Sequence, residues 1–310
     1  MPTTNTHMRS ICLVLGVWLA AGCSNQPPEM NVGSGAGTDA GGLTRTGDGQ
    51  LMQFAVVGDS RPPNLNQTTK YPAAIVAGNF KLMQSMGAQF AVATGDYMFA
   101  NDDADVQAQL DQYFMGEMNF TGPVYRTMGN HECTGATASN CPAFDETPNM
   151  KAFMTRLLPS GMTTPYYRID IDTPFGKAKF VFVAANAWSD TQATWLQQQL
   201  ADSTVYTFVM RHEPPDTTET PGVTPSENII HQFPLTLELL GHSHYYRRVD
   251  TQHVICGNGG APISGGGHGS NYGFLMITQQ NDGSLAASEI DESTGNPVDG
   301  WKVKADGTAL

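Results

Sequence analysis

The sequence predicts an α/β fold with parallel strands. Three short apolar runs, at residues 51–57, 88–94 and 122–128, have the composition of buried strands, and each stops at a glycine followed by a polar residue. Segments 71–87 and 105–118, which lie between these runs, carry apolar residues at helical spacing. Repeated strand–helix–strand units bring the carboxyl ends of parallel strands to one edge of a sheet. We therefore expect the residues that follow these strands to lie together.

The rest of the chain predicts a second set of elements. Residues 164–171 and 177–186 are typical of a hairpin, residues 191–200 of a helix, and residues 205–211 of a strand that ends at His212. One helical turn is expected at about 228–232, before an apolar strand at 235–240. Residues 272–292 predict a hairpin that turns at Asn-Asp-Gly. No structure is assigned beyond Asn296.

Side chains of the types that bind metals follow the carboxyl ends of the predicted strands. Four of the eight histidines belong to this set. Carboxylates, an amide and imidazoles together suit zinc, manganese or iron. Asp96, central in the order, is placed to bridge two metals about 3.5 to 4 Å apart, as two-metal phosphoryl chemistry requires. The set comprises Asp59, Asp96, Asn130, His131, His212, His242 and His244.

The motifs VVGDSR, TGDYMF, GNHE, MRHE and GHSHYYRR, followed by GNGGAP, occur in this order between residues 54 and 262. Together they resemble the calcineurin-like metallophosphoesterase superfamily, and within it the purple-acid-phosphatase-like branch. The resemblance implies a four-layer α-β-β-α sandwich of two mixed sheets. It also implies hydrolysis of phosphomonoesters or phosphodiesters by metal-activated hydroxide, with one or two divalent or trivalent ions (Mn, Zn or Fe).

The resemblance also assigns roles to residues. His131 would stabilise the developing charge or protonate the leaving oxygen. One metal would be held by Asp59, Asp96 and His244. The other metal would be held by Asp96, Asn130, His212 and His242. Apart from the resemblance, Tyr246 and Arg248 are candidates either for substrate binding or for simple packing of an aromatic ring beside an arginine.

Two positions depart from the family pattern. Arg61 stands where many members have a histidine ligand of the first metal, and Phe99 stands where purple acid phosphatases have a tyrosine ligand. Three outcomes follow. Water completes the first site; Arg61 grips the phosphate beside a single metal and so takes part in catalysis; or catalysis has been lost. The last outcome would make the chain a degenerate surface lipoprotein that acts in binding or adhesion.

The N-terminal part of the chain is expected to be a lipoprotein signal. A basic residue precedes the apolar run 11–22, and the stretch AAGCSN resembles a lipobox whose Cys23 is lipidated. We expect a signal peptide at 1–22, a disordered Gly- and Pro-rich tether at 23–50, the phosphoesterase domain at 51–296 and a frayed tail at 297–310. The protein would be an exported bacterial lipoprotein of the outer membrane, facing the periplasm or the cell surface and touching the membrane only through its lipid.

The net charge and the cysteines give further expectations about binding partners and disulfides. The net charge is −13 with only 16 Lys and Arg, so no nucleic-acid binding is expected. In an exported protein, Cys133 and Cys141 are close enough in sequence to close a loop by a disulfide. Cys256, in an apolar stretch, is expected to be a buried small hydrophobe.

Overall fold

The structure is a computed structural model that describes residues 43–45, 50–134, 141, 146–265 and 271–310. The chain divides into two units, Met1–Met30 and Asn31–Leu310, and every described element belongs to the second. The predicted signal peptide and the predicted lipidation site Cys23 lie outside the described residues. In the part of the chain that is described, no helix combines the length and apolarity needed to cross a bilayer.

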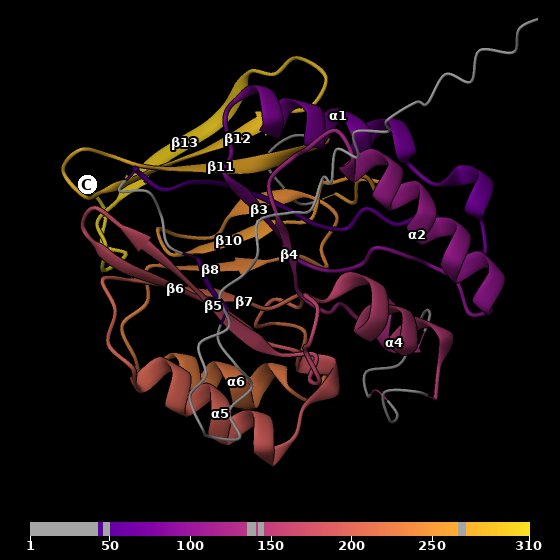
Figure 1. The fold of residues 1–310 in the computed structure, drawn as a ribbon, viewed down its shortest axis with the longest axis horizontal. Helices are drawn as coiled ribbons and strands as arrows, with labels where there is room; N and C mark the ends of the chain where they lie inside the picture. The colour runs from indigo at the N-terminus through magenta and orange to yellow at the C-terminus, as the bar shows by residue number, and fades with distance from the viewer. Residues whose placement is uncertain (1–42, 46–49, 135–140, 142–145, 266–270) are drawn as a thin grey trace, which may run out of the picture. The chain divides into compact units, whose positions relative to one another are not determined.

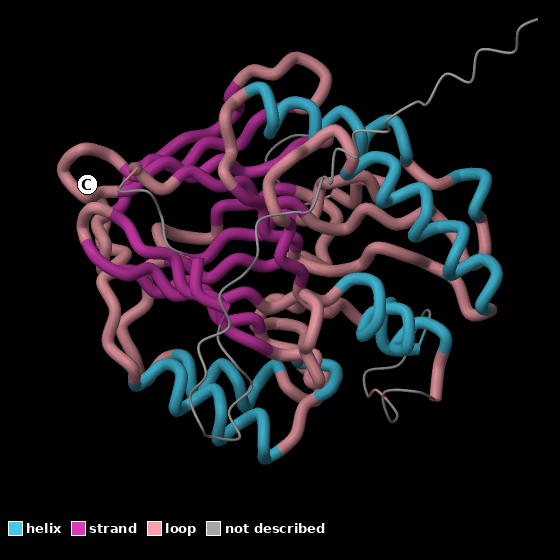
Figure 2. The backbone as a smooth tube through the Cα atoms, viewed as in Figure 1, coloured by secondary structure: helices cyan, strands magenta, loops and turns pink. Residues whose placement is uncertain are grey.

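Two mixed β-sheets form the centre of the second unit (Figures 1 and 2). The seven-stranded sheet has, in spatial order, β1 (Leu43–Arg45), β5 (Tyr167–Thr173), β6 (Gly176–Phe182), β7 (Tyr206–Met210), β8 (Leu237–Leu240), β10 (His253–Cys256) and β9 (Tyr246–Arg248). The six-stranded sheet has β13 (Pro297–Val303), β12 (Leu285–Asp291), β11 (Gly273–Gln279), β2 (Gln53–Val57), β3 (Phe90–Ala93) and β4 (Val124–Arg126).

Helices lie outside the two sheets, so the predicted four-layer α/β sandwich is confirmed (Figure 1). The six-stranded sheet is covered by α1 (Ala73–Ser85) and α2 (Asp103–Glu117), and the seven-stranded sheet by α5 (Asp190–Ala201) and α6 (Val223–Ile230). Shorter helical segments are η1 (Thr68–Lys70), α3 (His131–Thr134), α4 (Pro148–Ala152), η2 (Phe153–Leu157, a π-helix) and η3 (Ala185–Ala187).

The predicted strand directions are also confirmed. Strands β2, β3 and β4 run parallel, with α1 and α2 as their crossovers, and β6, β7 and β8 run parallel in the other sheet. Both predicted hairpins are present, as the antiparallel pairs β5–β6 and β11–β12. The carboxyl ends of two groups of parallel strands are therefore available to build one site.

Aromatic side chains hold the two sheets together. The ring of Phe54 on β2 makes edge contacts with Phe180 on β6 and Phe208 on β7, at centroid distances of 5.1 and 5.2 Å. Phe90 on β3 packs against the same Phe180 at 5.3 Å. Burial of each such ring stabilises the fold by about 1.5 to 3 kcal/mol. This packing fixes the position of one sheet's strand ends relative to those of the other.

The predicted frayed tail at 297–310 is wrong. Residues Pro297–Val303 form β13, which pairs antiparallel with β12, and Val303 also bridges to Ala309. An edge strand needs only one hydrogen-bonded partner and tolerates proline and charged residues, so its sequence lacks the apolar run of a central strand.

Two smaller expectations also need correction. Leu43–Arg45, within the predicted disordered tether, pairs in parallel with β5 as β1. The single turn expected at 228–232 is the end of a longer helix, α6, which starts at Val223. Pro225 lies in the first turn of α6, where backbone N–H groups have no intrahelical partner and proline costs little.

Candidate metal centre

The predicted ligands lie directly after the strands of both sheets. Asp59 follows β2, Asp96 follows β3, and Asn130 and His131 follow β4. From the other sheet, His212 follows β7, and His242 and His244 follow β8. The contacts described below bring all seven residues together.

The backbone at this centre has an unusual conformation. Asp59, Asp96 and His242 have positive φ angles of 56°, 60° and 68°, and the described residues include only one other non-glycine residue in this region. Such conformations cost of order 1 kcal/mol or more each and are concentrated at functional sites. Gly95 also has a positive φ, of 115°, and a Cβ there would lie 2.5 Å from Nδ1 of His212. The Gly-Asp pair after β3 therefore lets the two sheets approach closely.

Four side chains form the tighter part of the centre. Oδ1 of Asn130 lies 3.2 Å from Nε2 of His212 and 3.1 Å from Nδ1 of His242, and Oδ1 of Asp96 lies 3.3 Å from the same Nε2 of His212. Nδ1 of His212 donates to the carbonyl of Thr94 at 2.8 Å. Because that carbonyl accepts the Nδ1 proton, Nε2 is left as the nitrogen available to an ion.

A second cluster shares Asp96. Ligand atoms of Asp59, Asp96 and His244 lie within 4.8 Å of one another. Oδ2 of Asp59 accepts the backbone N–H of His242 at 3.0 Å, whereas its Oδ1, which is buried 3.7 Å from Nε2 of His244, has no hydrogen-bond partner. A buried carboxylate oxygen without a partner is costly. A cation at this position would remove that cost.

The guanidinium of Arg61 contacts this second cluster. Nδ1 of His244 donates to the carbonyl of Pro262 at 3.1 Å, so Nε2 carries the lone pair, and Nη2 of Arg61 donates to it at 3.1 Å. Nε of Arg61 lies 3.5 Å from Oδ2 of Asp96. Arg61 therefore contacts the ligand atoms that a first metal would use, and its charge disfavours a cation there.

Phe99 supports both predicted catalytic side chains. Its ring lies 4.4 Å from the ring of His131 in an edge arrangement, and Cζ of Arg61 lies 4.7 Å from the Phe99 centroid on its face. Nε2 of His131 lies 3.6 Å from Oδ2 of Asp96. The sequence showed only that Phe99 cannot ligate a metal. Its role as a platform depends on contacts between residues far apart in the chain.

Two buried glutamates complete the surroundings. The carboxylate of Glu132 accepts the backbone N–H groups of Asp96, Tyr97 and Gly129 at 2.8 to 2.9 Å and so joins the loops after β3 and β4. Glu213 places a carboxylate oxygen within 4.8 Å of ring nitrogens of His212 and His242, and neither of its oxygens has a hydrogen-bond partner. Their positions in the sequence, each following a ligand, were the only signal that could have found them.

Burial and neighbouring charges shift the pKa values of several predicted ligands. Burial raises the pKa of Asp59 well above its usual value. Burial opposes the charge of Asp96 too, but His131 and His212 outweigh it and hold that pKa well below its usual value. Burial lowers the pKa of His242 and His244 to about 4, with the charges of His212 and Arg61 respectively acting in the same direction. These two imidazoles are therefore neutral, as metal ligands must be.

The donor set thus fits a divalent or trivalent metal. Carboxylate oxygens, an amide oxygen and imidazole nitrogens match zinc, manganese and iron. The position between Asp96, Asn130, His212 and His242 offers four candidate ligand side chains. The position between Asp59, Asp96 and His244 has three, and it has Arg61 as a competitor.

The structure does not bring Tyr246 and Arg248 to this centre. The hydroxyl of buried Tyr246 donates to Asp299 at 2.9 Å, and the guanidinium of Arg248 pairs with the same carboxylate and lies over the ring of Trp301 at 5.2 Å. Both side chains therefore serve to attach β9 to β13, and the geometry does not support their predicted role in substrate binding.

The cysteines have the predicted arrangement. Cys133 and Cys141 form a disulfide with a Cα–Cα distance of 4.9 Å, immediately after the Asn130–His131 pair. Cys256 is buried and unpaired on β10. The disulfide joins Cys141 to α3, which carries His131.

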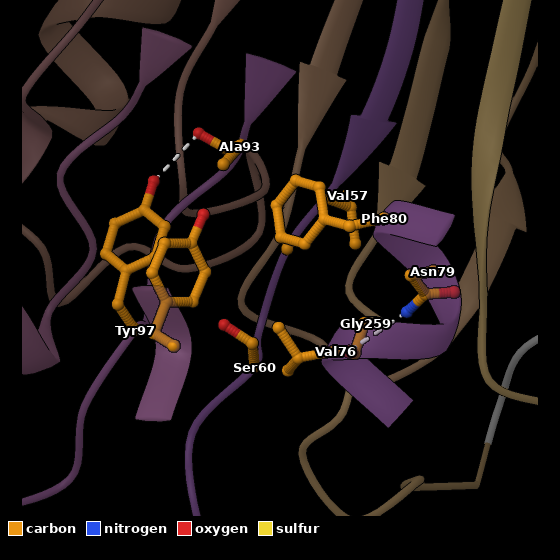
Figure 3. A pocket seen from close by; sticks show the side chains of 10 residues that line it. Val57, Ser60, Val76, Asn79, Phe80, Ala93, Tyr97 and Gly259 are labelled. Carbon is orange, nitrogen blue, oxygen red and sulfur yellow. Dashed lines mark hydrogen bonds between the residues drawn. The ribbon is translucent and has the colours of Figure 1, made fainter. Parts of the chain in front are cut away.

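A small cavity lies beneath the centre, between β2, β3 and the helices α1 and α2 (Figure 3). Its volume of about 10 Å³ is roughly that needed for one water molecule, far too small for a phosphate ester. Around it, the Tyr97 hydroxyl donates to the carbonyl of Ala93, and Nδ2 of Asn79 donates to the carbonyl of Gly259. Residues next to Asp59 and Asp96 line this cavity, which is too small to be a substrate pocket.

Comparison with known proteins agrees with this geometry. A family model described as calcineurin-like phosphoesterase matches residues 52–246, and no curated protein matches the chain. Among solved structures, a purple acid phosphatase from yellow lupin (Lupinus luteus) seeds superposes with a TM-score of 0.62 at 15% identity over 84% of this chain and 55% of that chain. This chain therefore spans about half the length of the lupin enzyme.

Two further solved structures have the same fold. A dimetal phosphatase from Danio rerio has a TM-score of 0.57 at 12% identity, covering 82% of this chain and 99% of that chain. PhoD has a TM-score of 0.55 at 13% identity, covering 84% of this chain and 71% of that chain. At these identities the structural likeness establishes the fold alone.

The family model covers more than half of the chain, so the chain belongs to the calcineurin-like phosphoesterase family. Membership of the family implies one or two divalent metal ions.

Proposed function

We propose that the strand-end cluster hydrolyses phosphomonoesters or phosphodiesters outside the cytoplasm. The observation that carries this proposal is the position of Asp96. Its Oδ1 faces His212 at 3.3 Å, and its Oδ2 faces His131 at 3.6 Å and Arg61 at 3.5 Å. One carboxylate therefore joins both candidate metal positions to both candidate catalytic residues.

Each predicted residue has a distinct role in the proposed reaction. Asp96, Asn130, His212 and His242 would hold one ion, and Asp59, Asp96 and His244 would hold another. A metal bound here makes water acidic enough to serve as a nucleophile near neutral pH and neutralises phosphate oxygens. The planar fork of Arg61 suits two phosphate oxygens. His131, held between Asp96 and Phe99, stabilises negative charge or donates a proton to the leaving oxygen.

The proposed location is that of an exported bacterial lipoprotein anchored through Cys23 in the outer membrane, facing the periplasm or the cell surface. The disulfide between Cys133 and Cys141 supports this part of the proposal, because such bonds persist in oxidising compartments. Phosphate-ester substrates outside the cytoplasm would then reach the centre directly. Mass spectrometry of the N-terminal peptide after expression in a bacterium tests it: acyl chains on Cys23 are expected, and an unmodified Cys23 would contradict it.

The activity is tested with p-nitrophenyl phosphate and bis-p-nitrophenyl phosphate. The protein is stripped with a chelator and reloaded with manganese, zinc or iron, and Asp96→Asn is compared with the exposed control Asp216→Asn. We expect turnover to return with metal and to fall by orders of magnitude only in Asp96→Asn. The preferred ester separates monoesterase from diesterase.

The alternative is a degenerate member of the fold that acts in binding or adhesion. The hydrogen bond between Arg61 and His244, at the first metal position, is the observation that favours it. Absence of turnover with every metal, in a folded protein that still binds metal, would overturn the proposed activity and support this alternative.

A further inference from the structure

A separate group of ligand-type side chains, here called the remote cluster, lies at the opposite end of the strands from the metal centre. Glu227 and His231 stand one turn apart at the end of α6, and His253 is the first residue of β10. A carboxylate oxygen of Glu227 and one ring nitrogen of each histidine lie within 4.8 Å of one another. The strand β8 separates this cluster from the centre described above, because His242 follows the carboxyl end of β8 and this cluster lies beside its amino-terminal half.

His253 is oriented by a carboxylate. Its Nδ1 lies 2.8 and 2.9 Å from the two oxygens of Asp250, which can only accept a hydrogen bond when ionised. Nδ1 therefore carries the proton, and Nε2 points away from Asp250 towards Oε2 of Glu238 at 3.6 Å. A carboxylate on the far nitrogen of a metal-binding imidazole is a common feature of zinc sites, where it fixes the tautomer and the ring orientation.

Glu238 supplies the independent observation that points to a ligand. It lies on the interior strand β8 and is fully buried. Its Oε1 pairs with Arg211, whereas its Oε2 has no hydrogen-bond partner. Oε2 is directed at Nε2 of His253, a nitrogen whose own lone pair faces it in the neutral ring. Two lone pairs facing each other in a buried place repel, and a cation between them would remove that repulsion.

Arg211 accounts for only half of the acidic oxygens. Its buried Nη2 lies 2.6 Å from Oε2 of Glu227 and 3.1 Å from Oε1 of Glu238. The other oxygen of each glutamate faces a histidine: Oε1 of Glu227 lies 2.9 Å from Nε2 of His231, and Oε2 of Glu238 faces His253. With Asp250 included, three carboxylates and one guanidinium leave two negative charges when the imidazoles are neutral.

We propose that Glu227, Glu238, His231 and His253 bind a divalent zinc-type cation that is separate from the catalytic metals. Two imidazoles and two carboxylates form a four-ligand set suited to zinc. With ligand bonds of about 2.0 Å, tetrahedral neighbours lie about 3.3 Å apart. The Glu227–His231 and Glu238–His253 pairs, at 2.9 and 3.6 Å, bracket that separation. The side chain of His231 is 61% exposed and is free to make the remaining adjustment. The ion would fasten the end of α6 to β8 and β10.

The test counts zinc in four forms of the full-length protein. Zinc chloride is titrated calorimetrically into metal-stripped wild type, His231→Ala, Asp96→Asn and the double variant, with exposed Thr224→Ala on α6 as the matched control. We expect His231→Ala to lose one zinc equivalent that Thr224→Ala and Asp96→Asn retain, and the two losses to add in the double variant. Zinc should also raise the unfolding temperature of Asp96→Asn but raise that of the double variant less.

An unchanged zinc count and affinity in His231→Ala would overturn the proposal and leave the cluster as ion pairs around Arg211. Circular dichroism establishes that His231→Ala is folded, which is expected because the side chain is exposed. The result does not depend on phosphoesterase activity, since the zinc equivalent at issue is counted in the Asp96→Asn background.

Discussion

Oε2 of Glu132 accepts the backbone N–H of Asp96 at 2.8 Å, and the same oxygen accepts that of Gly129 at 2.9 Å. One buried carboxylate thus holds the loop after β3 against the loop after β4. Asp96 and Asn130, which those loops carry, belong to different strands but serve the same candidate metal position. The position of Asp96 therefore depends on a residue outside the predicted ligand set.

We predict that Glu132→Gln weakens metal binding without removing a ligand. The amide nitrogen of glutamine would face at least one of the N–H groups that the carboxylate now accepts, which leaves a buried donor without a partner. We expect a loss of about 1 to 3 kcal/mol in unfolding free energy and a loss of about tenfold or more in metal affinity. Urea unfolding and metal titration, with exposed Glu146→Gln as control, measure both. Equal affinities in the two variants would contradict this role.

Arg61→His should increase the number of ions that the catalytic centre binds. The substitution removes a positive charge from beside Asp96 and His244 and offers a further imidazole to the first position. We expect the weaker of the two catalytic ions to bind at least about tenfold more tightly, while the exposed control Arg247→His leaves binding unchanged. Metal titration is carried out in the His231→Ala background, so that binding at the remote cluster does not contribute to the measured affinity. No gain in binding would show that Arg61 is not what weakens the first position.

Phe99→Leu should lower turnover while the fold is retained. Leucine removes the face on which Arg61 lies and the edge contact with His131, each worth about 1 kcal/mol. We expect a decrease of about tenfold in kcat/KM, recovered in Phe99→Tyr, which retains the ring. Steady-state kinetics with the better nitrophenyl ester provides the measurement, and Phe175→Leu at an exposed phenylalanine is the control. A wild-type kcat/KM in Phe99→Leu would contradict the role of Phe99 as a platform for Arg61 and His131.

The stability of the protein should fall as the pH rises through a range set by Glu289. Burial raises the pKa of this residue on β12 to about 8, although Asn258 and Asn271 donate to its Oε1 and oppose the shift. Between the unfolded value near 4.5 and the folded value near 8, the folded state holds a proton that the unfolded state releases, so unfolding becomes easier with increasing pH.

Glu289→Gln should abolish that loss, because the amide does not titrate. We expect the wild type to lose on the order of 2 to 4 kcal/mol between pH 5 and pH 8.5 relative to the variant. Urea unfolding at the two pH values provides the measurement, with Glu146→Gln as the control at an exposed site. Parallel pH profiles for wild type and Glu289→Gln would contradict the assignment.

The sequence alone was sufficient to predict the central strands, the parallel direction of β2, β3 and β4, and the polar residues that follow the strands, but not β1 or β13. An apolar run that stops at a glycine and a polar residue is a local pattern, and parallel strands must place their ends at one edge. Asp59, Asp96, Asn130 and the three histidines His212, His242 and His244 could therefore be named before any contact was known. The disulfide and the helices α1, α2 and α5 also depend on local spacing.

Only the tertiary structure decided what those residues face. Tyr246 lies two positions after His244, yet an edge strand turns it towards Asp299. Phe99 has no ligand chemistry, yet it packs on Arg61 and His131. Glu227 and His231 are one helical turn apart on α6, but nothing in the sequence connects them with His253 on β10. Contacts of this kind arise from the packing of segments that are distant along the chain, and the free energy of that packing is a property of the whole core, which no short motif contains.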